Sequence, residues 1–116
     1  MIQVLIIDDE QHCIDRLIKL LIPSHNNLFE ITGTALTVED GIEKITLLKP
    51  DLIFLDVQIN GKTGFDLLRT LTEINFAIIF TTAYEKFAIQ AIKFSAIDYL
   101  LKPCLLYISP SPRDRG

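Results

Sequence analysis

The sequence predicts one α/β domain in which a parallel sheet is covered by helices on both faces. Short apolar runs alternate with segments whose apolar residues recur at helical spacing, as in a sheet built from βαβ units. The chain has 116 residues, near the commonest domain length, and 49% of them are hydrophobic. The mean hydropathy of +0.34 favours a sheet that is mostly buried. We therefore expect a single folded domain with a substantial core.

The first strand and helix are predicted within residues 2–23. Ile2–Ile7 is rich in β-branched residues, which is typical of a strand buried on both faces. After an acidic stretch, apolar residues recur at helical spacing until Pro23 closes the segment. They are Ile14, Leu17, Ile18 and Leu21.

A second strand and helix follow within residues 29–49. Phe29–Ala35 predicts the strand. Thr37 lies three residues before Asp40, a variant of the capping box with Asp in place of Glu, and marks the start of the helix. Lys49-Pro50 predicts its end.

The second half of the chain repeats the alternation. Strands are predicted at 52–55, 77–80 and 99–101, and helices at 64–71 and 85–94. Together the elements give (βα)4β, which implies parallel strands with right-handed crossovers. The predicted fold is a flavodoxin-like, doubly wound five-stranded sheet with strand order 2-1-3-4-5.

Composition excludes several classes of function. The net charge of −4 argues against a nucleic-acid surface, which needs clustered Lys and Arg. The longest apolar runs, such as Val4–Ile7, are far shorter than the ~20 residues of a membrane span. The N-terminus does not resemble a signal peptide, so we expect a cytoplasmic location. Cys13 and Cys104 are expected to be small buried or half-buried thiols, and His12 and His25 to be solvated.

Residues that carry chemistry follow the ends of the predicted strands. Asp8 and Asp9 follow the first strand, Asp56 the third, Thr82 the fourth and Lys102 the fifth. Ligands of open α/β sheets bind beyond the carboxyl ends of the strands, so we expect these side chains on one rim. An acid pair after a strand is commonly just a helix cap. The five placements together nevertheless indicate a functional site.

Three carboxylates on one rim repel one another, and a hard divalent cation relieves that repulsion. Mg²⁺ fits best, because it binds through one or two carboxylates and is completed by water and a phosphate oxygen. With the metal in place, Asp56 can act as a nucleophile toward phosphorus. Lys102 would neutralise charge on the phosphoryl group, and Thr82 is suited to hydrogen-bond one of its oxygens.

Four motifs carry a family resemblance. They are Asp8-Asp9-Glu10, Leu55-Asp56, Thr82-Ala83 and Tyr99-Leu100-Leu101-Lys102-Pro103. Over residues 2–103 the chain resembles the receiver domain of two-component response regulators. The stretch from Phe80 to Pro103 is similar to receivers of the LytR/AlgR type, which normally precede a LytTR DNA-binding domain.

The resemblance implies a role for each site residue. Asp56 would be the phosphoacceptor. Asp9 would bind Mg²⁺ directly, Asp8 largely through water, and the backbone carbonyl of Gln58 would be a further ligand. Lys102 would contact the phosphoryl oxygens and the acids. Such a domain catalyses its own phosphorylation and dephosphorylation at Asp56 without being an enzyme in the usual sense.

The resemblance also implies a switch and its partners. Thr82 would move toward the phosphoryl group and the ring of Tyr99 would turn into the vacated space. The phosphoryl donor would be a sensor histidine kinase. The fourth helix and fifth strand would form the readout surface and, in the full-length protein, a homodimer interface. The segment itself would bind neither nucleic acid nor membrane.

One departure and three alternatives bear on this interpretation. Ile59-Asn60-Gly61 stands where the family usually has a Met-Pro or similar pair, although Asn and Gly suit a tight turn. The acids after the first strand would repel the phosphate of a flavin unless a cation intervened, which disfavours a flavodoxin. Gln58 occupies the position of the second Asp of a haloacid-dehalogenase-type phosphatase. The open alternative is a stand-alone receiver that acts as a protein-interaction switch or phosphate sink with no DNA-binding output.

Residues 104–116 do not follow the receiver pattern. A receiver continues into a fifth helix, but Ser109-Pro110-Ser111-Pro112 cannot form a helix interior. The segment from Cys104 to Asp114 also resembles the conceptual translation of a transposase-based sequencing adapter, with Ile108 in place of the expected threonine. We expect residues 1–103 to be the receiver, with the fifth helix missing. Residues 104–116 would then be a non-native tail, or alternatively a genuine disordered terminus.

Overall fold

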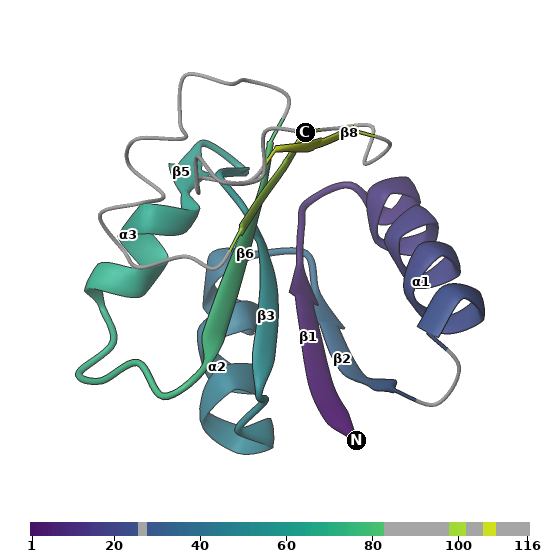
Figure 1. Ribbon diagram of the computed structural model, residues 1–116. Coiled ribbons are helices and arrows are strands. Elements are labelled where there is room, and N and C mark those ends of the chain that lie inside the picture. Colours follow the sequence, from purple (N-terminus) through teal and green to yellow (C-terminus); the bar gives the residue numbers. More distant parts are fainter. Residues whose placement is uncertain (26–27, 83–97, 102–105, 109–116) are drawn as a thin grey trace.

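Six strands form one sheet in the computed structural model, which describes residues 1–25, 28–82, 98–101 and 106–108. The strand order is β2-β1-β3-β6-β7-β8, and all neighbours except β7 and β8 pair in parallel (Figure 1). The strands are β1 Ile2–Ile7, β2 Phe29–Ala35, β3 Leu52–Asp56, β6 Ala77–Thr82, β7 Asp98–Leu101 and β8 Leu106–Ile108. The order of the five parallel strands confirms the predicted flavodoxin-like fold.

Helices cover both faces of this sheet. Helix α1 (Gln11–His25) packs on one face, and α2 (Val38–Leu48) and α3 (Gly64–Arg69) pack on the other (Figure 1). The Thr37 hydroxyl accepts a hydrogen bond from the backbone N of Asp40 at 3.0 Å, as expected of the helix cap. Lys49 ends α2 with a left-handed φ of 47°.

The apolar strands contribute to two cores, one on each side of the sheet. Leu5 and Ile7 of β1 belong to the core beneath α2 and α3, whereas Val4 and Ile6 belong to the core beneath α1. Successive side chains of a strand point to opposite faces, so a strand covered on both sides is apolar throughout. On the α3 side, the rings of Phe65 and Phe80 lie 4.8 Å apart. The continuous apolar runs in the sequence follow from this two-sided burial.

Several boundaries differ from the prediction. Helix α1 continues through Pro23 to His25, because a proline so close to a helix end removes only one backbone donor. Helix α3 ends at Arg69 rather than Leu71, where the hydroxyl of Thr70 bonds the carbonyl of Leu67 at 2.7 Å. The predicted helix at 85–94 lies outside the described residues.

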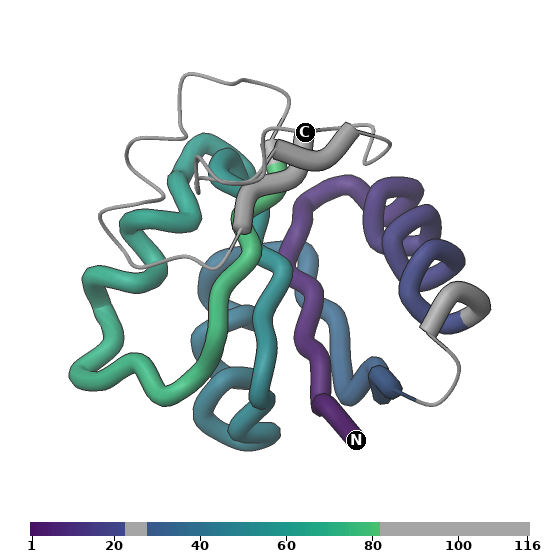
Figure 2. The backbone as a smooth tube through the Cα atoms, viewed as in Figure 1, coloured from purple at the N-terminus to yellow at the C-terminus, as the bar shows by residue number. Residues whose placement is uncertain are grey.

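Three strands were not predicted from the sequence. β4 (Gln58–Ile59) and β5 (Lys62–Thr63) form an antiparallel hairpin, and β8 pairs antiparallel with β7 at the edge of the sheet. Segments of two or three residues are too short to show a periodic pattern. The tube in Figure 2 traces β3 toward α3, with the hairpin lying between them.

Candidate functional site

Two of the predicted acids are neighbours at one end of the sheet. β1 and β3 pair with Ile7 opposite Leu55, so the residues that follow, Asp8 and Asp56, come next to each other across the two strands. Asp56 is paired on its other side with Thr81 of β6. Asp8, Asp56 and Thr81 are 4%, 3% and 3% exposed, and they are the buried polar residues among those described. An acid pair is therefore buried where the parallel strands end.

The loop after β1 holds a cluster of carboxylates. Carboxylate oxygens of Asp8, Asp9 and Glu10 lie within 4.8 Å of one another. The backbone N of Asp8 donates to the carbonyl of Ala35 at 3.0 Å, and Oδ1 of Asp8 accepts from the backbone N of Glu10 at 2.9 Å. These bonds hold the acidic loop against the end of β2.

Backbone hydrogen bonds of the residues that follow Asp56 hold this part of the site in place. Its Oδ1 accepts from the backbone N of Gln58 at 3.2 Å, and the next residue, Val57, donates to the carbonyl of Thr81 at 2.9 Å. The backbone N of Gly64, at the start of α3, donates to the carbonyl of Val57 at 2.8 Å. A Cβ at Gly64 would lie 2.5 Å from the carbonyl oxygen of Asp56, so only glycine allows this approach. Gly64 was not among the predicted site residues.

The hairpin after Asp56 connects the site to two other loops. Its turn has φ values of 50° at Asn60 and 80° at Gly61, the left-handed conformation that Asn-Gly favours in a tight hairpin. The backbone N of Asn60 donates to Oδ2 of Asp9 at 2.9 Å, and its Nδ2 donates to the carbonyl of Leu36 at 3.3 Å. The tight turn was predicted from Asn60 and Gly61, but its contact with Asp9 was not.

Charged side chains surround the hairpin. Lys62 of β5 forms an ion pair with Glu39 of α2, and its hydrogen bond holds the pKa of Glu39 below the ordinary value. Thr63 and Asp66 form a complete capping box at the start of α3, and the hydrogen bonds from Thr63 lower the pKa of Asp66. The hairpin is thus tied to both α2 and α3.

The other predicted site residues are described only in part. The backbones of Thr82 and Tyr99 lie in the adjacent strands β6 and β7, where Thr82 pairs with Leu101 and Tyr99 with Phe80. Lys102 lies outside the described residues. Gln58 is exposed at the start of β4.

The carboxylates at the ends of β1 and β3 are suitable ligands for a hard cation. The cluster offers only carboxylate oxygens, and Asp56 adds a further carboxyl on the neighbouring strand. Oxygen donors are the ligands that Mg²⁺ prefers. Asp8, Asp9 and Asp56 would therefore hold the cation at the strand ends.

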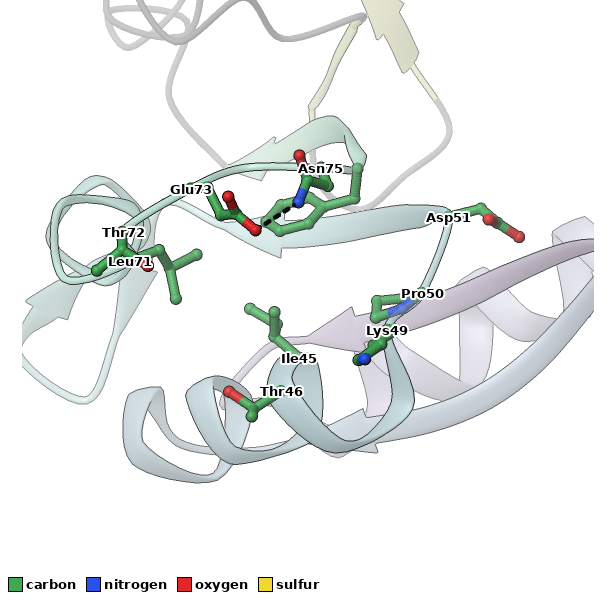
Figure 3. Close-up of a pocket in the computed structure, with 10 residues that line it drawn as sticks. Ile45, Thr46, Lys49, Pro50, Asp51, Leu71, Thr72, Glu73 and Asn75 are labelled. Atoms are coloured by element: carbon green, nitrogen blue, oxygen red, sulfur yellow. Dashed lines mark hydrogen bonds between the residues drawn. The ribbon is translucent and has the colours of Figure 1, made fainter.

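A separate pocket lies at the opposite end of the sheet. It has a volume of about 440 Å³ and opens between the end of α2 and the segment before β6 (Figure 3). Its lining residues are Ile45, Thr46, Lys49, Pro50, Asp51, Leu71, Thr72, Glu73, Asn75 and Phe76. On one side of it Nδ2 of Asn75 donates to Glu73 at 3.0 Å. The pocket includes none of the predicted site residues, so the strand ends remain the candidate site.

The fold and the acidic rim define a doubly wound α/β domain with a candidate cation site at the ends of its parallel strands. The family model described as the response regulator receiver domain matches residues 4–106. This chain belongs to that family. Receiver domains generally use Mg²⁺ at an acidic pocket, and those of two-component systems take phosphate from histidine kinases.

Similar proteins indicate which sub-family of receivers this chain resembles most. The sensory transduction proteins LytT of Bacillus anthracis and Bacillus subtilis (strain 168) are each 41% identical over 105 residues, 89% of this chain. An uncharacterized response regulatory protein of Vibrio parahaemolyticus is 43% identical over 104 residues. The chain spans only about two fifths of these relatives, covering 42% or 43% of their lengths. They support the LytR/AlgR sub-family that the sequence resembles.

Solved structures agree with the fold. The response regulatory domain of protein mrkE from Klebsiella pneumoniae has a TM-score of 0.73 and 31% identity, with 87% of this chain and 83% of that chain covered. The receiver domain of AraT from Geobacillus stearothermophilus has a TM-score of 0.76 and 28% identity, with 88% and 81% covered. No helix in the described ranges is long and apolar enough to cross a membrane.

Proposed function

We propose that this receiver takes a phosphoryl group from a sensor histidine kinase onto Asp56. The observation that carries the proposal is the buried Asp56 beside Asp8, next to a cluster of carboxylates suited to Mg²⁺. In the transfer, a carboxylate oxygen of Asp56 forms a bond to phosphorus. The bond from phosphorus to the histidine nitrogen breaks, and that nitrogen keeps the electron pair.

The proposed ligands of Mg²⁺ are Asp9 directly, Asp8 largely through water, Asp56 and the backbone carbonyl of Gln58. When bound, the cation would neutralise charge on the phosphoryl oxygens. The backbone N of Asn60 donates to Oδ2 of Asp9, and this bond supports a fixed position for that carboxylate beside the hairpin. Lys102 is proposed to supply a second positive charge.

The proposed output is control of transcription. The LytT relatives are more than twice as long as this chain, which leaves room for the proposed C-terminal LytTR DNA-binding domain. The full-length response regulator is proposed to be cytoplasmic. Dimerisation would use the fourth helix and β7. A stand-alone receiver acting as an interaction switch or phosphate sink is the alternative.

Residues 104–116 are proposed to be a non-native tail. Sequencing of the source locus tests this proposal.

Mass spectrometry after incubation with acetyl phosphate and Mg²⁺ tests the phosphoacceptor. We expect one phosphoryl group on the parent chain and none on Asp56→Asn, because Asp56 supplies the attacking oxygen. Asp15→Asn, an exposed acid of α1, is the matched control and should be phosphorylated like the parent. Unchanged uptake by Asp56→Asn, or full uptake in EDTA, would contradict the proposal.

The proposed switch couples Thr82 to Tyr99. Their backbones lie on the adjacent strands β6 and β7, and phosphorylation would add acceptor oxygens near the ends of those strands. We expect phosphorylation to change the NMR signals around Tyr99 in the parent chain. Thr82→Ala should lose this change, whereas Thr72→Ala at the other end of the sheet should keep it. An unaltered response in Thr82→Ala would show the coupling to be wrong.

A further inference from the structure

A second group of ligand atoms lies beside the acidic cluster, at the start of α1. A carboxylate oxygen of Glu10, an imidazole nitrogen of His12 and Sγ of Cys13 lie within 4.8 Å of one another. The Sγ of Cys13 donates to Oε1 of Glu10 at 3.5 Å. One oxygen, one nitrogen and one sulfur donor therefore lie close enough together to share one metal ion, unlike the oxygen-only cluster next to them.

The backbone holds these three residues in place. The N–H groups of Cys13 and Ile14 donate to the carbonyl of Glu10 at 3.0 and 3.3 Å, and the N–H of Glu10 donates to Asp8. His12 and Cys13 lie in the first turn of a 15-residue helix. Cys13 is 8% exposed, whereas Glu10 and His12 are exposed. An ion from solvent could therefore reach the group through its two exposed members.

We propose that Glu10, His12 and Cys13 bind a divalent transition metal of the zinc class. Such ions take four ligands, so a water completes the set. Thiolate and imidazole select zinc-like ions over Mg²⁺, which prefers oxygen. On binding, the Cys13 sulfur exchanges its proton for the metal and the proton passes to solvent. The positive end of the α1 dipole favours the negative sulfur.

Glu10 belongs to both groups of ligand atoms. A dication held by Glu10, His12 and Cys13 adds positive charge beside Asp8 and Asp9, and this charge opposes the binding of Mg²⁺ there. Occupancy of this second site therefore reduces Mg²⁺-dependent phosphorylation of Asp56, a consequence that rests on the proposed function.

Cobalt(II) tests the site directly, because a cobalt–thiolate bond gives a charge-transfer absorption that oxygen ligands do not. We expect the 116-residue chain to develop this band on titration with Co²⁺ and to lose it on adding Zn²⁺. Cys13→Ser and Cys13→Ala should lack the band. His12→Gln should weaken Co²⁺ binding at least about tenfold, since even outer-shell partners of a metal contribute that much. His12 is exposed, so this variant tests the site without disturbing the core.

The chain supplies its own matched controls, since it has two cysteines and two histidines. Cys104→Ser and His25→Gln should bind Co²⁺ like the parent. Absence of the band in the parent, or its loss in Cys104→Ser rather than Cys13→Ser, would overturn the site.

Acetyl phosphate uptake with Mg²⁺ tests the coupling. Zn²⁺ should slow uptake by the parent more than by Cys13→Ser, and equal inhibition would overturn the coupling. If the parent takes up no phosphoryl group at all, the proposed function fails while the cobalt band still decides the metal site.

Discussion

Asp9 and Gly64 show how single residues join the loops of the site. Oδ2 of Asp9 accepts from Asn60, so the acidic loop after β1 is tied to the hairpin after Asp56. Gly64 lets the start of α3 approach the backbone of Asp56 more closely than any side chain would permit. The Asp9–Asn60 bond links two loops that are far apart in sequence. The contact at Gly64 depends on the absence of a side chain there.

We expect Gly64→Ala to destabilise the fold by about 1–3 kcal/mol, the usual cost of forcing extra atoms into a packed region. The added Cβ would meet the carbonyl of Asp56 at 2.5 Å and the side chain of Leu55 at 2.9 Å. Urea unfolding measures the change. Gly61→Asn is the comparison and should cost less, because a Cβ there has open space and asparagine adopts a positive φ more readily than most residues. Equal stability of Gly64→Ala and the parent would contradict the expectation.

At the scale of elements, α3 depends on the cap that precedes it. The helix has six residues, too short to be stable alone, and begins where Thr63 and Asp66 bond each other's backbone N–H groups. Arg69 also pairs with Asp66 at 3.0 Å. The cap, the ion pair and the burial of Phe65 together position the helix against Asp56.

This cap predicts a pH dependence of stability. Hydrogen bonds from Thr63 lower the pKa of Asp66 in the folded state. The ionised carboxylate therefore stabilises the fold at pH values above its unfolded pKa of about 3.9. This contribution is lost as the pH falls through the lower, folded-state pKa. The difference in unfolding free energy between the parent and Asp66→Asn should be constant near neutral pH and shrink in acid.

Urea titrations from neutral to acidic pH measure the unfolding free energies of the parent and Asp66→Asn. Introducing Thr63→Ala into both chains should reduce the pH dependence of the difference, since it removes a hydrogen bond to the carboxylate. A difference that grows as the pH falls would show that the sign is wrong.

On the scale of the whole molecule, the two faces of the sheet are covered unequally by the described helices. α2 and α3 bury Ile78 and Phe80 of β6, whereas Ala77 and Ile79, on the α1 side, are only partly buried. Among the described helices, α1 alone packs on that side. Partly uncovered apolar surface favours association between copies.

We therefore expect the 116-residue chain to self-associate through this side of the sheet. Sedimentation velocity should show association that increases with concentration and weakens in Ile79→Thr. Leu47→Gln, at a residue that is 72% exposed on α2, should leave it unchanged. A monomeric, cooperative melt of the parent chain would contradict this expectation.

The strand order was predicted from the fold class that the (βα)4β alternation indicates. The sequence by itself determined the parallel sheet and the presence of Asp8, Asp9 and Asp56 at the strand ends. Those features follow from local patterns, because side-chain periodicity identifies strands and helices, and polar residues interrupt the apolar runs. The roles of Lys102, Thr82 and Tyr99 stay predictions, since their side chains lie outside the described part of the structure.

Only the tertiary structure decided which distant residues touch. The Asp9–Asn60 bond and the approach of Gly64 to Asp56 depend on the paths of the loops after β1 and β3. A short loop has no periodicity from which its path could be predicted. Its contacts are set by the packing of the elements that it connects.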